Sequence, residues 1–154
     1  MEQQLNHRAW FESPRIRLKM WREFRQSLDI NNTLEVCQTV IDWWKSSPLM
    51  AISIDPVDHT NWPTPWEMLH KGDFCENSLA LGMSYTIYYA NNRIPNRLVF
   101  VQNRKDSIQK LCALIDEKHL LNYRHGVIST LPDPSTVIYS VDVNTVVNNN
   151  YNNR

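Results

Sequence analysis

The sequence predicts an α+β fold, in which a helical N-terminal half precedes a buried central helix packed on a small antiparallel sheet. Residues 13–28 and 32–46 repeat apolar side chains at helical spacing behind capping residues. Residues 74–90 are apolar on almost every face, which is typical of a helix surrounded by other elements. The runs 97–102 and 124–143 are rich in strand-forming residues and predict the sheet.

Recognisable capping residues open the first two helices. Ser13 precedes Pro14, and Asn32 lies three residues before Glu35, so both sites favour a helix start. The first helix has a strongly basic side, which consists of Arg15, Arg17, Lys19, Arg22 and Arg25. We expect this side to face solvent, because neighbouring glutamates offset its charge. Contact with an acidic partner is the alternative.

The central helix carries a cysteine close to its N-terminus. Asp73 and Glu76 have the spacing of a capping box, which places Cys75 in the first helical turn. The unpaired backbone N–H groups and the helix dipole favour a thiolate at such a position. The setting suits a nucleophile, but cysteine is also among the residues most often buried as a small apolar side chain.

The other two cysteines are expected in the core. Cys37 lies on the apolar stripe of the helix predicted for residues 32–46, and Cys112 lies in the amphipathic run 105–118, which we interpret as helical. Both thiols should therefore be unpaired and chemically slow. Three widely spaced cysteines do not indicate a disulfide framework and favour a reduced, cytoplasmic setting.

A short helix leads into the central one through a tryptophan-rich stretch. Thr64 and Glu67 form a further capping box, and Gly72 is a suitable residue to end this helix. Trp62 and Trp66 lie in the same stretch. We expect these rings to cover the core, with an indole N–H that lines a site as the alternative.

The last predicted strands form a hairpin that suggests a catalytic pair. Residues 124–131 and 136–143 flank a proline-rich turn, and the symmetric register places His125 opposite Asp142. A carboxylate beside a histidine fixes its tautomer and stabilises its cation. With Cys75 nearby, these residues would be nucleophile, base and orienting group. Asn144, on the same face as the aspartate, is the alternative orienting residue.

At these residues the chain resembles the transglutaminase-like superfamily of papain-like cysteine enzymes. That family places its cysteine at the start of a buried helix in a Gly-x-Cys context, whereas Gly72-Asp73-Phe74-Cys75 has one residue more. Arg93-Ile94-Pro95-Asn96-Arg97 matches the family's Gly-Ile-Pro-Ala-Arg-like turn into a strand. The order Cys, His, Asp and its spacings also fit, over residues 64–144. Gly126 departs from the family, because an aromatic residue commonly follows the histidine there.

The resemblance implies hydrolysis or acyl transfer at an amide bond of a protein or peptide. Cys75 would attack the carbonyl carbon, His125 would accept the thiol proton and later protonate the leaving amine, and Asp142 would hold the imidazole. The backbone N–H of the cysteine, with Trp66 or Trp62, would stabilise the oxyanion or contact substrate. The alternative is a non-catalytic structural or interaction protein, such as a bacteriophage assembly or virion component, because the N-terminal segment also resembles small bacteriophage proteins.

Composition limits the remaining possibilities. The 154 residues have a formal net charge of zero, so we expect neither nucleic acid nor a membrane surface as partner. We expect one domain over residues 1–147, with a helical segment 13–47, a transglutaminase-like core 64–144 and a disordered asparagine-rich tail 148–154. We find no membrane-spanning run or signal peptide in the sequence, which favours the cytoplasm.

No metal or cofactor is predicted. Asp55, Asp58, His59 and His70 are the candidate ligands, but their spacing matches no tight metal-binding motif. The sequence also lacks a glycine-rich loop that could hold phosphate groups. The candidate chemistry therefore belongs to side chains alone.

Overall fold

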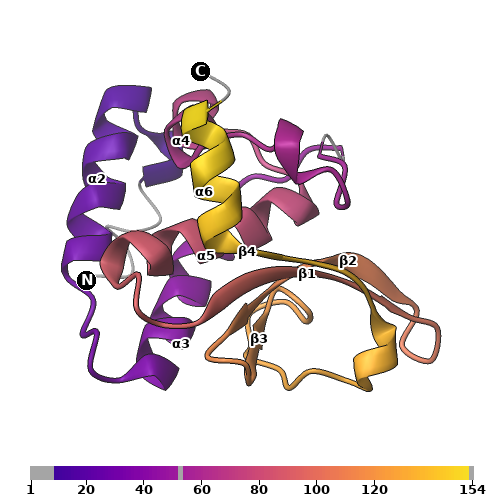
Figure 1. Cartoon of the computed structure of the whole chain (residues 1–154). Coiled ribbons are helices and arrows are strands. Elements are labelled where there is room, and N and C mark those ends of the chain that lie inside the picture. The colour runs from indigo at the N-terminus through magenta and orange to yellow at the C-terminus, as the bar shows by residue number, and fades with distance from the viewer. Residues whose placement is uncertain (1–8, 52–53, 153–154) are drawn as a thin grey trace.

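The computed structural model describes residues 9–51 and 54–152 and confirms the α+β class (Figure 1). The α-helices of this part are α2 (Pro14–Gln26), α3 (Thr33–Trp44), α4 (Pro65–Lys71), α5 (Glu76–Ala90) and α6 (Val143–Asn152). The strands are β1 (Asn96–Asn103), β2 (Ile108–Ile115), β3 (His119–Leu121) and β4 (Val137–Asp142). Short 3₁₀ helices are η1 (Ala9–Phe11), η2 (His59–Asn61) and η3 (Pro134–Thr136).

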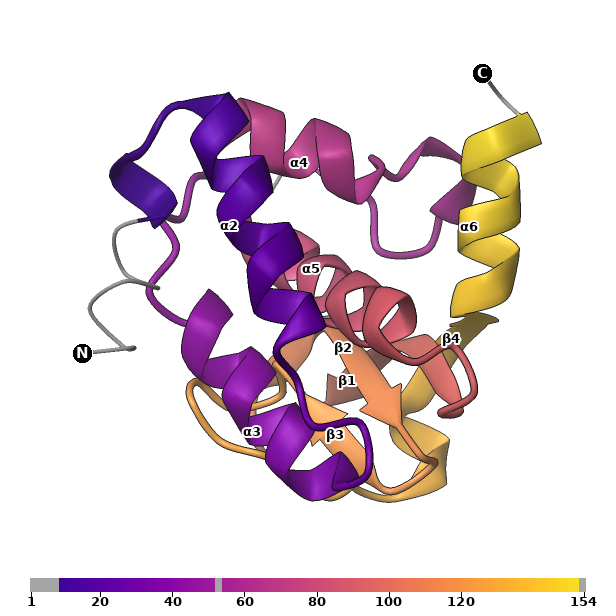
Figure 2. The same cartoon turned by 90° about the vertical axis from the view of Figure 1, so that its left-hand side faces the viewer.

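Helix α5 is the centre of the molecule, as the sequence predicts. It packs on β1 and β2 and is covered by α2, α3, α4 and α6 (Figures 1 and 2). Every residue from 77 to 87 is buried, which explains why this helix is apolar on all faces. The helix is therefore enclosed by elements from both halves of the chain.

Two features of α5 allow the tryptophans to pack against it. A Cβ atom at Gly82 would lie 2.6 Å from the ring of Trp44, so only glycine leaves room for that ring. One turn later, the Thr86 hydroxyl accepts hydrogen bonds from the indole nitrogens of Trp21 at 2.9 Å and Trp44 at 3.0 Å. This single hydroxyl thus joins α2, α3 and α5 in the core.

The sheet has the strand order β3-β2-β1-β4 and is antiparallel throughout. One face packs on the helices, and the other packs on the segment 122–136 through a second apolar cluster. That cluster contains Val99, Val101, Cys112, Leu114, Leu120 and Tyr123. Both faces of β1 and β2 are therefore covered, so side chains that point to either face are apolar.

This double coverage corrects the prediction for residues 105–118. The segment was predicted as an amphipathic helix, but its centre is strand β2, which pairs with β1 from Asn96↔Ile115 to Asn103↔Ile108. A strand buried on both faces loses the alternation of apolar and polar residues, and its apolar run then resembles a helical stripe. Cys112 is buried as expected, although it lies on a strand.

The predicted hairpin of residues 124–131 with 136–143 is wrong. Strand β4 pairs with β1, and residues 124–131 form turns that are joined to β3 by the single bridge Leu120↔Ser129. Between the two segments, Pro134 starts the 3₁₀ helix η3 instead of a tight turn. The chain then reaches the open edge of β1, where the backbone groups of β4 find partners.

Two further predictions, on the basic side of α2 and on the C-terminal tail, also need correction. The basic side of α2 is not wholly solvated, because Arg17 is 7% exposed and donates to the Leu69 carbonyl at 2.6 Å and the Glu12 carbonyl at 2.9 Å. Of the tail 148–154, which was predicted to be disordered, residues 148–152 belong to α6, and residues 153–154 lie outside the described residues. Earlier in α6, Val146 and Val147 are buried. These valines give the helix an apolar face that packs on the core.

Two predicted capping pairs are confirmed, whereas Ser13 is the N-cap residue of α2 without a side-chain capping hydrogen bond. The Asn32 side chain accepts the Glu35 N–H at 3.2 Å, and Thr64 and Glu67 form a reciprocal capping box at the start of α4. Gly72 ends α4 in the left-handed conformation with φ of 79°. Across the described ranges 9–51 and 54–152, the helices are too short and too polar for any of them to cross a bilayer.

Candidate functional site

Cys75 is the N-cap residue of α5 and is completely enclosed. Its exposed fraction is 0%, and the helix begins at Glu76, one residue later than a first-turn position would require. The capping box is formed by Cys75 and Ser78, not by the predicted Asp73 and Glu76. The Ser78 hydroxyl accepts the Cys75 N–H at 2.8 Å and donates to the Cys75 carbonyl at 2.9 Å.

This capping box changes the chemistry at the helix end. The backbone N–H of Cys75 was the predicted oxyanion donor, but it is already satisfied by a side chain within the fold. An oxyanion hole needs donors aimed at a position that substrate can occupy. Because the cysteine is also sealed from solvent, substrate would need a local rearrangement to reach the sulfur.

Two buried asparagines connect this helix end to the sheet. Asn77 accepts the backbone N–H of Leu111 at 3.0 Å and donates to the Ile54 carbonyl at 3.3 Å. Asn122 donates to the carbonyls of Glu76 at 2.8 Å and Leu111 at 3.0 Å. Neutral amides thus hold α5 against β2, in the region where the resemblance requires an imidazole and a carboxylate.

Sequence reasoning missed both asparagines. Asn77 is a polar residue inside an almost wholly apolar helix, which is a signal of a buried hydrogen bond. Asn122 has φ of 73°, a left-handed conformation that asparagine tolerates better than most residues. A single sequence does not disclose which backbone groups these amides meet, because both partners are distant along the chain.

His125 lies in an exposed turn and not at the start of a strand. The turn includes Gly126 with φ of 78°, and the Gln38 side chain of α3 donates to the Gly126 carbonyl at 3.2 Å. The turn is thereby attached to the outside of α3. The imidazole is on the exposed surface, whereas Cys75 is buried.

Asp142 caps the start of the last helix through Asn144. Asp142 ends β4 opposite Arg97, and its carboxylate accepts the Asn144 backbone N–H at 2.8 Å and the Asn144 side-chain amide at 3.0 Å. Both residues are exposed. The predicted orienting residue and its alternative therefore bond to each other at the start of α6.

The strand order explains why His125 and Asp142 do not meet. The histidine follows β3 and the aspartate ends β4, which are opposite edges of the sheet with β2 and β1 between them. With a spacing of about 4.8 Å between strands, the two edges are about 14 Å apart. The structure does not assemble the predicted arrangement of Cys75, His125 and Asp142.

The two candidate tryptophans differ in their surroundings. Trp62 is 3% exposed, and its indole N–H donates to the Asp55 carbonyl at 2.7 Å, so it closes the loop that precedes α4. Trp66 is 42% exposed and packs edge-on against Trp21 and Tyr89. It belongs to the outer surface of α2 and α4, not to the surroundings of the cysteine.

The core cysteines are poor nucleophiles. Burial raises the pKa of the Cys37 thiol to about 12, with a further contribution from the charge of Asp116. Burial also raises the pKa of the Cys112 thiol to about 12, although Lys110 opposes the shift. A thiol with such a pKa is almost wholly protonated near neutral pH and reacts slowly.

The candidate metal ligands do not converge in the structure. Nδ1 of His59 shares a hydrogen bond of 2.5 Å with the Tyr139 hydroxyl, and Asp58 binds the side chains of Thr60 and Asn61. His70 lies on α4. Within residues 9–51 and 54–152, no group of three His, Cys, Asp or Glu side chains is arranged to hold a metal ion.

Comparisons with known proteins add no family. A scan against protein families finds no match, and neither does a search of curated proteins. The resemblance to the transglutaminase-like superfamily therefore rests on the short motifs alone and stays a prediction. Any functional argument has to come from the residues and their geometry.

Proposed function

We propose that this chain is a non-catalytic interaction protein whose binding partner is another protein. The complete enclosure of Cys75 carries the proposal, because a cysteine nucleophile must be reached by substrate. The dispersion of His125 and Asp142 to other parts of the surface agrees with it. A role in bacteriophage assembly or in a virion, and a cytoplasmic location, are compatible with this class and remain predictions.

The interior also favours a scaffold. Ser78 binds the Cys75 N–H, Asn122 binds the Glu76 carbonyl, and Asn77 binds the Leu111 N–H of β2. Such a network stabilises one arrangement of helix and sheet and commits the Cys75 N–H to the fold. The surface, in contrast, presents an exposed indole at Trp66 beside the arginines of α2, and Trp and Arg are enriched among residues that dominate interfaces.

Thiol reactivity tests the non-catalytic assignment. The native protein is treated with iodoacetamide near pH 7, and the labelling of each cysteine is followed by mass spectrometry. We expect Cys75, Cys37 and Cys112 all to react more slowly than glutathione in the native protein, and to react alike after unfolding in urea. The urea sample is the control for intrinsic reactivity.

A second assay addresses acyl transfer directly. We expect no Cys75-dependent incorporation of a labelled primary amine into a glutamine-containing peptide, and no Cys75-dependent hydrolysis of that peptide. The comparison is between the wild type and Cys75→Ala. Labelling of Cys75 faster than glutathione, together with loss of this rate in His125→Ala, would overturn the proposal and restore the enzyme assignment.

A further inference from the structure

An open groove lies along α2 and the start of α4. Its volume is about 1070 Å³, and it is lined by eleven residues, which are the N-cap Ser13 and residues of α2 and α4. Its apolar lining includes Ile16, Leu18 and Trp66, and the Ile16 and Trp66 side chains are 44% and 42% exposed. We call this feature the α2–α4 groove. Exposed large apolar side chains in a concave surface are typical of a binding site.

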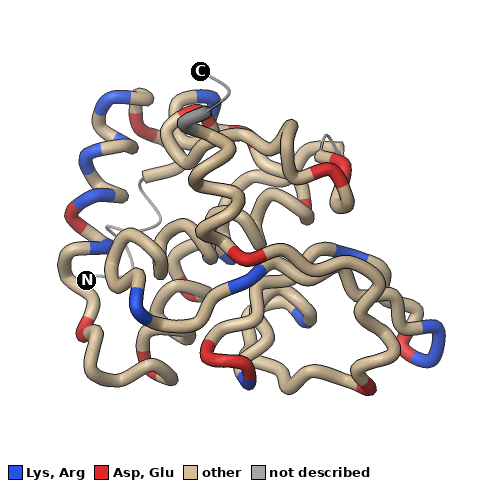
Figure 3. Tube along the Cα trace, in the orientation of Figure 1, with Lys and Arg blue, Asp and Glu red and all other residues tan. Residues whose placement is uncertain are grey.

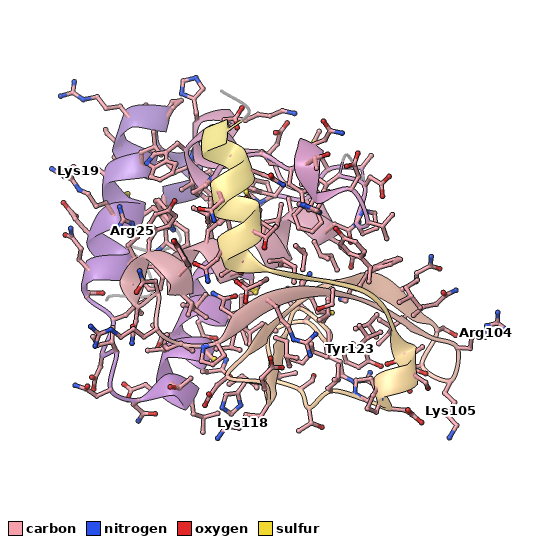
Figure 4. The ribbon with its side chains drawn as sticks, viewed as in Figure 1. Lys19, Arg25, Arg104, Lys105, Lys118 and Tyr123 are labelled. Atoms are coloured by element: carbon pink, nitrogen blue, oxygen red, sulfur yellow. The ribbon has the colours of Figure 1, made fainter. Side chains whose placement is uncertain are left out.

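The groove is also lined by cations. Arg15, Lys19 and Arg22 follow each other at spacings of four and three residues, so they form one stripe along α2. The stripe spans seven residues, which corresponds to about 10 Å along the helix axis. Figure 3 shows the concentration of Lys and Arg on α2, and Figure 4 shows Lys19 extended into solvent.

Arg25 extends the charge toward the aromatic residues. Its guanidinium carbon lies 4.7 Å from the ring centre of Trp21 and 5.6 Å from that of Tyr89, at the junction of α2 and α5 (Figure 4). In the described part of the chain its shielded Nε atom has no hydrogen-bond acceptor. Burial, and then the charge of Arg22, lower the pKa of Arg25. An anion in the groove would give the Nε atom an acceptor and would stabilise the charged form of Arg25.

Acidic residues of the chain do not balance this charge. Of the four cations, only Lys19 has an ion pair among the described residues, with Glu23 at 3.9 Å. Both of these side chains are mostly exposed, at 66% and 59%, so the pair is strongly screened. The other three cations face the groove with their charge available.

We propose that the α2–α4 groove binds an acidic peptide segment of a partner protein through its carboxylates and one large apolar side chain. The carboxylates pair with the guanidinium groups of α2, whose planar donors match a carboxylate in pairs. The apolar side chain packs on Ile16 and Trp66. This inference deepens the proposed interaction function and rests on it.

The groove fits a peptide better than a single-stranded nucleic acid. Nucleic acid binding without sequence preference uses successive exposed rings on which bases stack. Here Trp66 is the ring with a large exposed surface, whereas Trp21 is 1% exposed and lies under it. A single apolar anchor beside a row of cations matches an acidic segment with one large side chain.

Fluorescence anisotropy with a designed probe tests the proposal. The probe is a labelled peptide of about twelve residues, rich in glutamate and with one central phenylalanine. We expect saturable binding to the full chain with a Kd below about 1 mM, weakened by salt. Probes with glutamine for glutamate, or serine for phenylalanine, should bind at least about tenfold more weakly.

Two double variants locate the binding. Arg15→Glu with Arg22→Glu reverses two exposed charges of the groove, and should weaken binding about tenfold or more. Arg104→Glu with Lys105→Glu makes the same change of net charge in the exposed β1–β2 turn, far from α2 (Figure 4). This matched control should bind as the wild type does.

Ile16→Ser should weaken binding of the phenylalanine probe and leave the serine probe unchanged.

The outcomes separate this inference from the proposed function. No saturable binding, or equal weakening by both double variants, overturns the groove assignment. A labelled oligothymidine that binds more tightly than the peptide, and whose binding is lost in Arg15→Glu with Arg22→Glu, overturns the peptide in favour of nucleic acid. Neither result alters the thiol test. Slow labelling of Cys75 together with no saturable peptide binding therefore rejects this inference and leaves the proposed function in place.

Discussion

Replacement of Thr86 by valine should reveal how strongly one hydroxyl holds the helical layer together. Valine has nearly the same shape and helix propensity, so the change removes mainly the hydrogen bonds. The Thr86 hydroxyl accepts from Trp21 Nε1 at 2.9 Å and Trp44 Nε1 at 3.0 Å, and it donates to the Gly82 carbonyl at 2.6 Å. The residue and both indoles are at most 1% exposed.

The expected loss follows from the two indole N–H groups. In the variant both donors are buried without this acceptor, and each costs about 1–3 kcal/mol. The Gly82 carbonyl keeps its place in the helical hydrogen-bond ladder, and the new methyl group returns about 0.8 kcal/mol. We therefore expect Thr86→Val to lower the free energy of unfolding by about 1–5 kcal/mol.

Urea denaturation followed by far-UV circular dichroism measures this loss. Thr39→Val is the matched control, because Thr39 is a half-buried threonine of α3, and its stability should change by no more than about 0.5 kcal/mol. Trp44→Phe completes a double-mutant cycle, in which the second substitution should be less harmful after Thr86→Val. A loss below about 1 kcal/mol, or the absence of coupling in the cycle, would refute the reasoning.

Three further predictions concern packing, pH and the start of α5. Gly82→Ala should lower stability by about 1–3 kcal/mol in urea, because its Cβ would meet the Trp44 ring; an unchanged midpoint contradicts this close contact. Burial raises the pKa of the Cys37 and Cys112 thiols to about 12, so stability should fall as pH rises from about 8.5 toward 12, by up to about 1.4 kcal/mol per pH unit per thiol. Cys112→Ala should show a shallower fall between these pH values, and an equal slope rejects the assignment. Asn77→Leu leaves a β2 backbone N–H without its acceptor and should cost about 1–3 kcal/mol by the same measurement, whereas no loss would mean that water or backbone replaces the amide.

Local patterns in the sequence predicted the helical half well. Asn32 and Thr64 are capping residues whose side chains meet backbone groups only three residues away, and such contacts do not depend on the rest of the fold. The central helix was also predicted, because an all-round apolar run of that length has few alternatives. Its start was placed too early, because Asp73 and Glu76 have the same spacing as the pair that caps it, Cys75 and Ser78.

The sheet could be predicted only in part. Strand β1 was identified from its apolar run, but β2 was interpreted as a helix, because the cover formed by residues 122–136 removes the polar alternation. The partner of β4 depends on which strand edge is open when the chain returns, and that is not a local property. The symmetric hairpin register was therefore plausible from the sequence and wrong in the structure.

The failure of the hairpin also decided the candidate site. His125 and Asp142 were joined by that register alone, so the change of strand order separates them by the width of the sheet. Cys75 was placed correctly near a helix N-terminus, but its exposure was not predictable, because the residues that seal it come from distant parts of the chain. Asn77 and Asn122 were missed for the same reason.

In this chain the start of α5 contributes to stability, whereas the exposed cations along α2 are available for binding. At the start of α5, neutral amides and a hydroxyl already bind the Cys75 N–H, the Glu76 carbonyl and the Leu111 N–H, so these backbone groups serve the fold. Along α2, Arg17 is absorbed into the core, where its guanidinium binds backbone carbonyls, while Arg22 and its neighbours remain at the groove without such partners. The same helix therefore uses one arginine for folding and leaves the others available for a ligand. Because charges that fold the chain are already compensated, those that are not are the better guide to what the protein binds.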